Sequence, residues 1–424
     1  MSRILYNAAL YLGAPALAGA FAWKMASKPA YREGAFQKLG LFLPRQTRRT
    51  IWIHAVSVGE TMAALRLARK LAGAQSRFRI MFSTSTPTGQ QVARRELSPE
   101  ANVFYFPFDF PGAAARAVAA INPAALALVD TEFWPNVIHA CAKRGAAVIL
   151  VNGRMSDRSY PRYMKFRKLI KPTLEEVSLF MTQGEKDRER FLDIGAAPEK
   201  VLAAGNLKFD QETAPISAEQ SAAIKKSLGI GPEEQVVVLG SVHQGEQAAI
   251  RAAAGVLGPG RRLVIAPRRI DNLEWIEREL EPYGLRISRR SQWPAMAMAD
   301  FKTVPIIDTF GELGKIYSIA SVAFVGGSLI SHGGQNPLEP ASRGVPSLFG
   351  PGMSNFSEAS QALVAANGAF TVATQEEMGT KLAHLMADEP ARLTAGAAAR
   401  AVVERNQGAT TLAAERIMSL ARAD

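Results

Sequence analysis

The chain has one cysteine among its 424 residues and lacks the usual motifs of metal and nucleotide cofactors. The single cysteine, Cys141, excludes an internal disulfide framework and fits a reducing compartment. No GxGxxG follows a candidate strand, no GxxxxGK(S/T) occurs, and there is neither an HExxH nor a pair of cysteines. A conventional dinucleotide site, a P-loop and a common zinc site are therefore not expected.

The rest of the composition is that of a globular protein. Hydrophobic residues make up 48% of the chain and charged residues 21%, which at this length predicts sizeable cores in two domains with an additional segment. The 50 basic and 38 acidic residues give a net charge of +12, which indicates anionic partners such as nucleic acid, lipid head groups or phosphorylated substrates. The basic residues are not interleaved with aromatics on one face, which argues against nucleic acid.

The N-terminal segment, residues 1–49, has the pattern of a membrane anchor. Ile4 to Trp23 contains no charge over twenty residues, about the length needed to cross a bilayer core of roughly 30 Å. Seven basic residues and one acid follow between Lys24 and Arg49. A signal peptide would carry its basic residues before the apolar run, and a buried core helix would leave the basic stretch unexplained.

We therefore expect this segment to attach the protein to the inner (cytoplasmic) membrane, either by spanning it or by lying in its interface. The stretch from Lys24 to Arg49 would then form a basic collar against an anionic membrane surface. Because basic residues are retained on the cytoplasmic side, the body of the protein is expected on that face.

From Thr50 onward, short β-branched runs alternate with helical stretches, which predicts parallel sheets covered on both faces. Residues 211–220 look like a polar connector between two such halves. Two doubly wound α/β halves would place their strand ends across a cleft, where ligands are expected. The predicted strands are 50–57, 79–85, 102–108, 124–130, 147–153 and 178–183 in the first half, and 235–241, 262–267, 285–289, 304–310, 321–328 and 345–350 in the second.

Three carboxylates of the first half follow predicted strands. Glu60 opens a helical pattern, where it could simply interact with the positive end of the helix dipole. The same place, past the carboxyl end of a strand in an α/β fold, is also where reacting groups are usually mounted. Asp130 and Glu132 lie beside an aromatic, where they suit the binding of hydroxyls or amines, or the capping of the next helix.

The densest pattern of the second half runs from Phe324 to Gly344. An apolar strand ends there in Gly326, Gly327 and Ser328, whose backbone amides could approach a phosphate. The same residues could equally form a tight turn before a capped helix. Both readings stay open on the sequence alone.

Two helix starts in the second half are further candidates for binding a nucleotide. Asn336 is a good N-cap with Pro337 at the first helical position, and Glu339 in the first turn could bind the hydroxyls of a ribose. Gly311 and Glu312 open a second helix, whose first amides could bind a base or a phosphate.

Two cations lie where they could meet a phosphate. Arg268 follows Pro267 at the end of a buried strand, and a guanidinium there needs an anion or a ring to stack on, unless the loop is simply solvated. Lys208 lies at the predicted domain junction, from which it could reach a leaving phosphate or point into solvent.

Eight motifs together identify a family. They are HAVSVGE, STPTG, DTEFWPN, NGRMSDRS, GNLKFD, APRR, DTFGEL and FVGGSLISHGGQNPLEP, in this order over nearly the whole chain. In this combination the chain resembles the 3-deoxy-D-manno-octulosonic acid (Kdo) transferases of lipopolysaccharide biosynthesis. The resemblance implies a GT-B glycosyltransferase fold of two Rossmann-like domains with an N-terminal membrane-anchor helix. Residues 50–210 would bind the acceptor, and residues 211–424 would bind CMP-Kdo, with a C-terminal helix returning toward the first domain.

The resemblance also assigns residue roles. It implies that Glu60 is the catalytic base and that Asp130 and Lys208 support the transition state, although the family commonly has a glutamate in place of Asp130. Glu132 is the acceptor-side candidate. The implied CMP contacts are Pro267, Arg268, Phe310, Gly311, Glu312, Asn336, Pro337, Leu338 and Glu339.

The implied reaction is the inverting transfer of Kdo from CMP-Kdo to the lipid A precursor, a tetraacylated, bisphosphorylated disaccharide (lipid IVA). No metal or cofactor beyond the donor is expected. Three alternatives share features of the sequence: another GT-B transferase that uses a different nucleotide sugar on a lipid acceptor, a nucleotide-sugar epimerase, and a non-catalytic, membrane-tethered nucleotide-binding protein.

Overall fold

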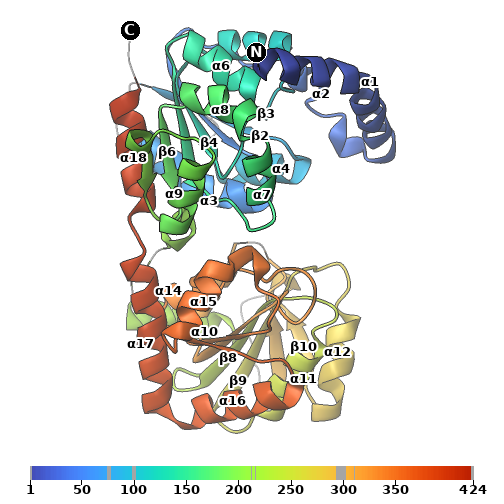
Figure 1. Cartoon of the computed structure of the whole chain (residues 1–424). Coiled ribbons are helices and arrows are strands. Elements are labelled where there is room, and N and C mark those ends of the chain that lie inside the picture. Colours follow the sequence, from blue (N-terminus) through green and yellow to red (C-terminus); the bar gives the residue numbers. More distant parts are fainter. Residues whose placement is uncertain are drawn as a thin grey trace. The chain divides into compact units, whose positions relative to one another are not determined.

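The computed structural model describes residues 2–73, 78–97, 102–211, 213–214, 216–292, 302–309 and 311–421. It divides the chain into two compact units (Figure 1). The first unit comprises residues 1–210 and 407–424, and the second comprises residues 211–406. Each unit is built on a seven-stranded sheet with helices on both faces, which confirms the predicted α/β class.

The sheet of the first unit has the order β3-β2-β1-β4-β5-β6-β7, and its paired strands are parallel. All residues of its two central strands, TIWIHA and PAALALV, are buried, as expected for a parallel sheet covered on both faces. The strands are β1 (Thr50–Ala55), β2 (Arg79–Thr84), β3 (Asn102–Tyr105), β4 (Pro123–Val129), β5 (Ala147–Gly153), β6 (Leu179–Thr182) and β7 (Val201–Ala203).

Alternate side chains of β1 enter two different cores. Trp52 packs in one cluster with Phe104 and Phe180, whereas Ile51 and Ile53 belong to the cluster on the other face. The covering helices are α1 (Ser2–Ser27), α2 (Ala35–Lys38), α3 (Val58–Gly73), α4 (Pro87–Glu96), α5 (Pro111–Ile121), α6 (Pro135–Lys143), α7 (Tyr160–Lys165), α8 (Arg167–Glu176), α9 (Glu185–Asp193) and α18 (Ala409–Leu420), with 3-10 turns η1 (Pro29–Tyr31), η2 (Pro198–Lys200) and η3 (Leu207–Phe209).

The sheet of the second unit has the order β10-β11-β9-β8-β12-β13-β14. Its strands are β8 (Gln235–Val242), β9 (Arg261–Pro267), β10 (Arg286–Arg289), β11 (Thr303–Ile306), β12 (Val322–Val325), β13 (Ser347–Phe349) and β14 (Ala369–Thr371). The helices are α10 (Ala218–Ser227), α11 (Gln247–Gly255), α12 (Glu274–Leu280), α13 (Leu313–Ile316), α14 (Leu338–Ser342), α15 (Ser357–Ala365), α16 (Gln375–Ala387) and α17 (Glu389–Arg405), with 3-10 turns η4 (Glu281–Tyr283), η5 (Arg290–Gln292), η6 (Tyr317–Ile319) and η7 (Ser354–Phe356).

Each sheet has a point at which the strand order reverses. In the first unit it lies between β1 and β4, and in the second between β8 and β12. In open α/β sheets, ligands bind beyond the carboxyl ends of the strands at such a point. The loops that follow these four strands are therefore the places to examine for chemistry.

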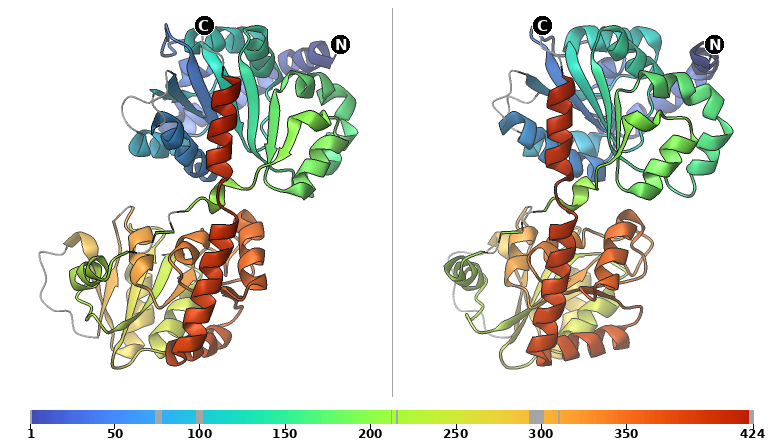
Figure 2. Two further views of the ribbon diagram at one scale, coloured as in Figure 1. Left: turned by 90° about the vertical axis from the view of Figure 1, so that its left-hand side faces the viewer. Right: turned by 60° about the vertical axis from the view of Figure 1, so that its left-hand side comes forward.

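The C-terminal tail consists of two helices rather than one. α17 and α18 are separated at Gly408, whose φ of +111° suits a residue without a Cβ. The carboxylate of Asp210 accepts hydrogen bonds from the amides of Gly408 and Thr410, both at 2.6 Å, and so caps α18. Because α18 packs along the first unit (Figure 2), the second unit ends at residue 406 and not at the chain terminus.

The N-terminal helix α1 lies against the first unit over much of its length. Near its start, the Tyr6 hydroxyl donates to Asp109 Oδ2 at 2.9 Å, and Asn136 donates to the side chain of Asn7 at 2.7 Å. Near its end, the ring of Phe21 meets that of Phe108 at a centroid distance of 5.2 Å. By length and composition, the stretch 3–27 is also the one described helix that could cross a membrane.

Candidate functional site

Glu60 lies in the first turn of α3, directly beyond the carboxyl end of β1. Its Oε2 accepts a hydrogen bond from the amide of Val56 at 2.7 Å, and its Oε1 accepts one from the hydroxyl of Ser57, also at 2.7 Å. These bonds resemble a capping box, so Glu60 does stabilise the start of α3, as the simpler interpretation of the sequence expects. They also hold the partly exposed carboxylate in one position.

Asp130 and Glu132 follow β4, the strand next to β1, so that they lie near Glu60 at the same sheet edge. Burial, followed by the negative charge of Glu60, raises the pKa of Asp130 to about 6, against the opposing effect of Lys208. Burial, then Glu60 and Asp130, raises the pKa of Glu132 to about 8. The structure thus brings the four candidates of the first unit together. Near neutral pH, Glu132 holds a proton while Asp130 is mostly ionised.

A buried residue that the sequence did not single out supports this cluster. Asn152, at the end of β5, is 2% exposed and donates from Nδ2 to Asp130 Oδ1 at 2.6 Å. Its Oδ1 accepts from the amide of Leu207 at 2.9 Å, next to Lys208. The available signal was an asparagine in the apolar run AVILVNG, because a buried amide must find hydrogen-bond partners.

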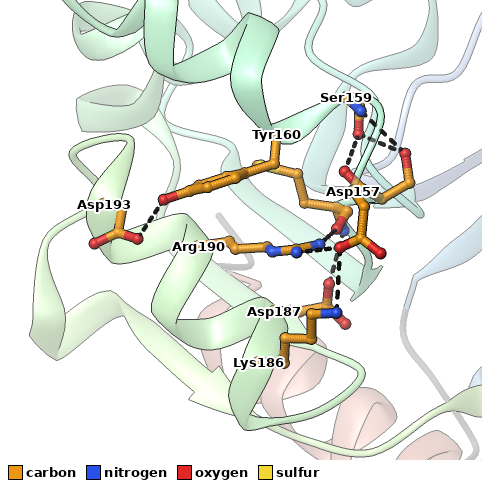
Figure 3. A network of polar contacts seen from close by, with 9 residues as sticks. Asp157, Ser159, Tyr160, Lys186, Asp187, Arg190 and Asp193 are labelled. Atoms are coloured by element: carbon orange, nitrogen blue, oxygen red, sulfur yellow. Dashed lines mark hydrogen bonds and ion pairs between the residues drawn. The ribbon is translucent and has the colours of Figure 1, made fainter.

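The loop after β5 is fixed to α9 by the polar network of Figure 3. The carboxylate of Asp187 accepts from the amide of Met155 at 2.8 Å, and the Arg190 guanidinium bonds to the Met155 carbonyl and to the carboxylate of Asp157. The same guanidinium lies 5.0 Å from the centre of the Tyr160 ring. This network fixes the chain that follows Arg154. The positive charge of Arg154 acts to lower the pKa of Asp130.

In the second unit, the glycine-rich loop after β12 is already occupied by a side chain of the protein. Glu246 is fully buried, and its carboxylate accepts from the amides of Gly327 at 2.7 Å, Ser328 at 3.0 Å and Leu329 at 3.0 Å. It also accepts from the amide of His243 at 2.9 Å. Although burial favours the protonated acid, the side chain of His243, 3.7 Å from Glu246 Oε2, and the backbone amides outweigh it and hold the pKa of Glu246 below its ordinary value.

The assignment of Gly326, Gly327 and Ser328 as a phosphate loop is therefore not supported. The amides of Gly327 and Ser328 donate hydrogen bonds to Glu246, and the amide of Gly326 donates to the carbonyl of Gly240 at 2.8 Å. A Cβ on Gly326 would lie 2.3 Å from the carbonyl oxygen of Ser241, so this glycine allows β12 to approach β8 closely. The physical reason for the error is that a nest of amides binds an internal carboxylate as well as a phosphate.

The predicted CMP contacts follow β9, β11 and β12, at the same edge of the second sheet. Pro267 is buried at the end of β9, and the side chain of Arg268 is exposed. Gly311 has a φ of +85°, and Glu312 accepts from the Thr309 hydroxyl. Phe310 lies outside the described residues.

The Asn336 turn differs by one residue from the expectation. α14 begins at Leu338, and Pro337 precedes it. Asn336 Oδ1 accepts from the Leu338 amide at 3.1 Å, and its Nδ2 donates to Glu339 Oε1 at 3.2 Å. The roles of these residues in binding CMP stay predictions.

Among the described residues, no group of three or more histidine, cysteine, aspartate and glutamate side chains is arranged to hold a metal ion. A family model and several relatives in sequence point to the same family. The model of the 3-deoxy-D-manno-octulosonic-acid (Kdo) transferases matches residues 33–211. A 3-deoxy-D-manno-octulosonic acid transferase of Haemophilus influenzae is 29% identical over 417 residues, which cover 96% of each chain. Together these matches support the Kdo transferase family for this chain.

A second relative and a solved structure extend the comparison. A bifunctional glycosyltransferase/methyltransferase of Fusobacterium nucleatum is 35% identical over 329 residues, which cover 77% of this chain and 51% of that relative's length. A glycosyltransferase structure from Rickettsia africae superposes with a TM-score of 0.58 at 11% identity, over 88% of this chain and 99% of the other. At such low identity the match shows the fold alone, and the chain has the GT-B fold.

Proposed function

We propose that this chain transfers Kdo from CMP-Kdo to the lipid A precursor in lipopolysaccharide biosynthesis, with Glu60 as the general base. The observation that carries the proposal is the group formed by Glu60, Asp130, Glu132 and Lys208 at the reversal point of the first sheet. A fixed carboxylate at this position suits proton transfer from a sugar hydroxyl. The donor and the acceptor are proposed from the similarity to the Kdo transferases.

In the proposed reaction, Glu60 removes the proton from the acceptor hydroxyl as its oxygen attacks the anomeric carbon of Kdo. The new C–O bond forms while the bond to CMP breaks, and CMP leaves with the bonding electrons from the opposite face, so the configuration inverts. General-base catalysis of this kind contributes about 10² to 10⁴ in rate.

Charge on the departing CMP is met by cations of the protein. Arg268 is exposed beyond β9, and in the part of the chain that the structure describes its guanidinium has no hydrogen bond or ion pair. A guanidinium binds a phosphate in two parallel hydrogen bonds. We assign it to the donor phosphate and Lys208 to the developing charge beside Asp130, without a bound metal.

Membrane attachment is assigned to α1. Its exposed apolar side chains include Leu12 (84% exposed) and Trp23 (67% exposed), which suit burial among acyl chains. Contacts from Tyr6 to Phe21 hold the helix along the first unit, and a helix that crossed the bilayer would carry those partners into the hydrocarbon. This docking favours a helix that lies in the interface of the inner membrane, with the basic collar against anionic lipid on the cytoplasmic face.

The experiment that tests the proposal is mass spectrometry of lipid A precursor incubated with the full-length protein and CMP-Kdo generated in the reaction, with and without EDTA. We expect the lipid to gain one or more Kdo units in both arms and Glu60→Gln, at matched protein amounts, to form product at least about 10²-fold more slowly. If wild-type protein leaves the lipid mass unchanged, the proposed acceptor or donor is wrong. Full turnover by Glu60→Gln would remove only the assignment of the base.

A further inference from the structure

The proposed reaction uses Asp130, which follows β4, and Lys208 on η3, but it gives no role to the residue that joins them. Asn152 is 2% exposed at the end of β5, and its side chain bonds in two directions. Nδ2 donates to Asp130 Oδ1 at 2.6 Å, and Oδ1 accepts from the amide of Leu207 at 2.9 Å. The partners fix the orientation of the amide group, because the Leu207 N–H can only donate.

The contacts continue along the sheet edge on the other side of Asn152. Its backbone carbonyl accepts from Gln183 Nε2 at 3.2 Å, and Gln183 Oε1 accepts from Asn206 Nδ2 at 3.1 Å. Asn206 Oδ1 in turn accepts from the amide of Lys208 at 3.0 Å. The ends of β4, β5 and β6 and the turn η3 are thus joined by one set of buried and partly buried hydrogen bonds centred on Asn152.

We propose that Asn152 is a positioning residue, whose side chain orients the Asp130 carboxylate and fixes it relative to the turn that carries Lys208. The inference rests on the proposed function only for the reaction in which Asp130 acts. The geometry itself is independent of the substrate. Because Asn152 touches no reacting atom in this scheme, its effect must pass through Asp130 and the η3 turn.

The backbone supports a specific role for this pair. Asp130 and Asn152 both have a φ of +61°, a left-handed conformation that asparagine and aspartate tolerate better than most residues. These conformations bring the two side chains into contact at neighbouring strand ends. A test by substitution must respect this φ, and glycine adopts it without strain.

Several charged side chains act on Asp130, and Asn152 is a neutral residue that also contacts it. Glu60 on α3 raises the proton affinity of Asp130, while Lys208 on η3 and Arg154 after β5 lower it; Glu132, on the same loop as Asp130, also interacts with it. The hydrogen bond from Asn152 favours the ionised carboxylate. Its loss should therefore leave Asp130 protonated at a higher pH than in the wild type.

The test is the titration of Asp130 in the full-length protein, followed by the NMR signal of its ¹³C-labelled carboxyl group and assigned with Asp130→Asn. In Asn152→Gly we expect the midpoint to move up from about 6. A rise of one unit would lower the ionised fraction about fivefold at pH 6 and by less than about a tenth at pH 8. The transfer rate of the variant should fall in the same pattern, with the larger loss on the acidic side.

Ser178→Ala is the matched control. Its hydroxyl accepts from the Val148 amide at 3.1 Å, at the opposite end of β5, so the variant loses a hydrogen bond to the same strand without touching Asp130. We expect no shift of the Asp130 midpoint and a transfer rate that changes by the same factor at pH 6 and pH 8. If Asn152 had a purely structural role, Asn152→Gly and Ser178→Ala would both leave the Asp130 midpoint unchanged, and each would change the transfer rate by the same factor at pH 6 and pH 8.

Asn152→Asp covers the case in which the glycine variant does not fold. It keeps an acceptor for the Leu207 amide but replaces the donor to Asp130 by a second carboxyl group, which should also move the Asp130 midpoint upward. An unchanged midpoint in the folded variants would overturn the inference. Because the titration needs no substrate, this result stays distinct from a failure of the proposed function, which would show as absence of transfer by wild-type protein.

Discussion

Glu60 and Glu246 occupy corresponding places in the two units but meet different surroundings. Each follows a glycine near the start of a helix and lies beyond a strand next to the reversal of the sheet order, β1 in one unit and β8 in the other. Glu246 is fully buried and accepts hydrogen bonds from four backbone amides. Glu60 is partly exposed and accepts one bond from an amide and one from a hydroxyl.

The neighbouring strand accounts for the difference. After β12, glycines let three amides approach the carboxylate of Glu246, so its charge is stabilised by fixed dipoles and by the side chain of His243. After β4, the loop brings Asp130 and Glu132, two more carboxyl groups, toward Glu60. One pattern of strand, glycine, glutamate and helix therefore gives a structural anion in one unit and a candidate base in the other.

The largest expected effect is the loss of transfer in Glu60→Gln. This substitution removes the proton acceptor but keeps the shape of the side chain, so turnover should fall by about 10² to 10⁴. Initial rates of CMP release in the presence of the lipid acceptor measure it. The midpoint of thermal unfolding should stay close to that of the wild type. If Glu60→Gln were inactive because it is unfolded, Glu60 would have a structural role like that of Glu246.

Glu246→Gln should lower the stability of the protein, whereas Glu60→Gln should lower the transfer rate. The amide NH₂ cannot accept a hydrogen bond, so at least one buried backbone N–H loses its partner and the charge-assisted bonds are lost. We expect the free energy of unfolding of the second unit to fall by about 3 kcal/mol. Urea unfolding measures it, with Glu60→Gln as the matched control. Equal stability of the two variants would show that the buried anion has no special structural role.

Glu132 should make the first unit sensitive to pH. Because its pKa is raised to about 8 from an ordinary value of 4.5, the folded protein holds a proton there that the unfolded chain has released. Its contribution to stability therefore falls as the pH rises from about 4.5 through 8. Glu132→Gln should remove this fall, so that the variant gains most over the wild type near pH 9.

The measurement for Glu132 is the midpoint of thermal unfolding at pH 5, 7 and 9. Glu175→Gln, at an exposed position on α8, serves as the control for removing a glutamate. Transfer at pH 7 by Glu132→Gln should stay within about threefold of the wild type, since the wild-type residue is already neutral there. A parallel pH dependence of stability in wild type and variant would contradict the assigned protonation.

Most of the fold could be predicted because buried apolar runs are visible in the sequence. β5 was predicted at its observed bounds, whereas β7 and β14 were missed. Both lie at sheet edges and have three residues each, too few for a pattern to emerge. The split of the C-terminal tail at Gly408 was also missed, since one glycine in a helical pattern does not specify the end of a helix. The family resemblance had implied that the C-terminal helix returns toward the first unit, to which residues 407–424 belong.

The candidate site could be predicted only in part. Glu60, Asp130 and Glu132 were found because they follow strands, and parallel strands place their carboxyl ends at one edge. Glu246 and Asn152 were not found, because their roles depend on which backbone groups approach them after folding. On the sequence alone, the glycines before Ser328 left a phosphate loop and a tight turn equally open, and the hydrogen bonds from the amides of Gly327 and Ser328 to Glu246 argue against the phosphate loop.

The smallest expected effect concerns the two bonds that hold Glu60. Ser57→Ala removes the hydroxyl that donates to Glu60 Oε1 at 2.7 Å but keeps the bond from the Val56 amide. Loss of a residue that caps a helix costs about 0.5 to 2 kcal/mol, so urea unfolding should detect a modest change. Since the carboxylate keeps one fixed bond, we expect transfer to fall by about tenfold or less, well short of Glu60→Gln. A loss as large as that of Glu60→Gln would mean that the hydroxyl itself, rather than the carboxylate it positions, takes part in the reaction.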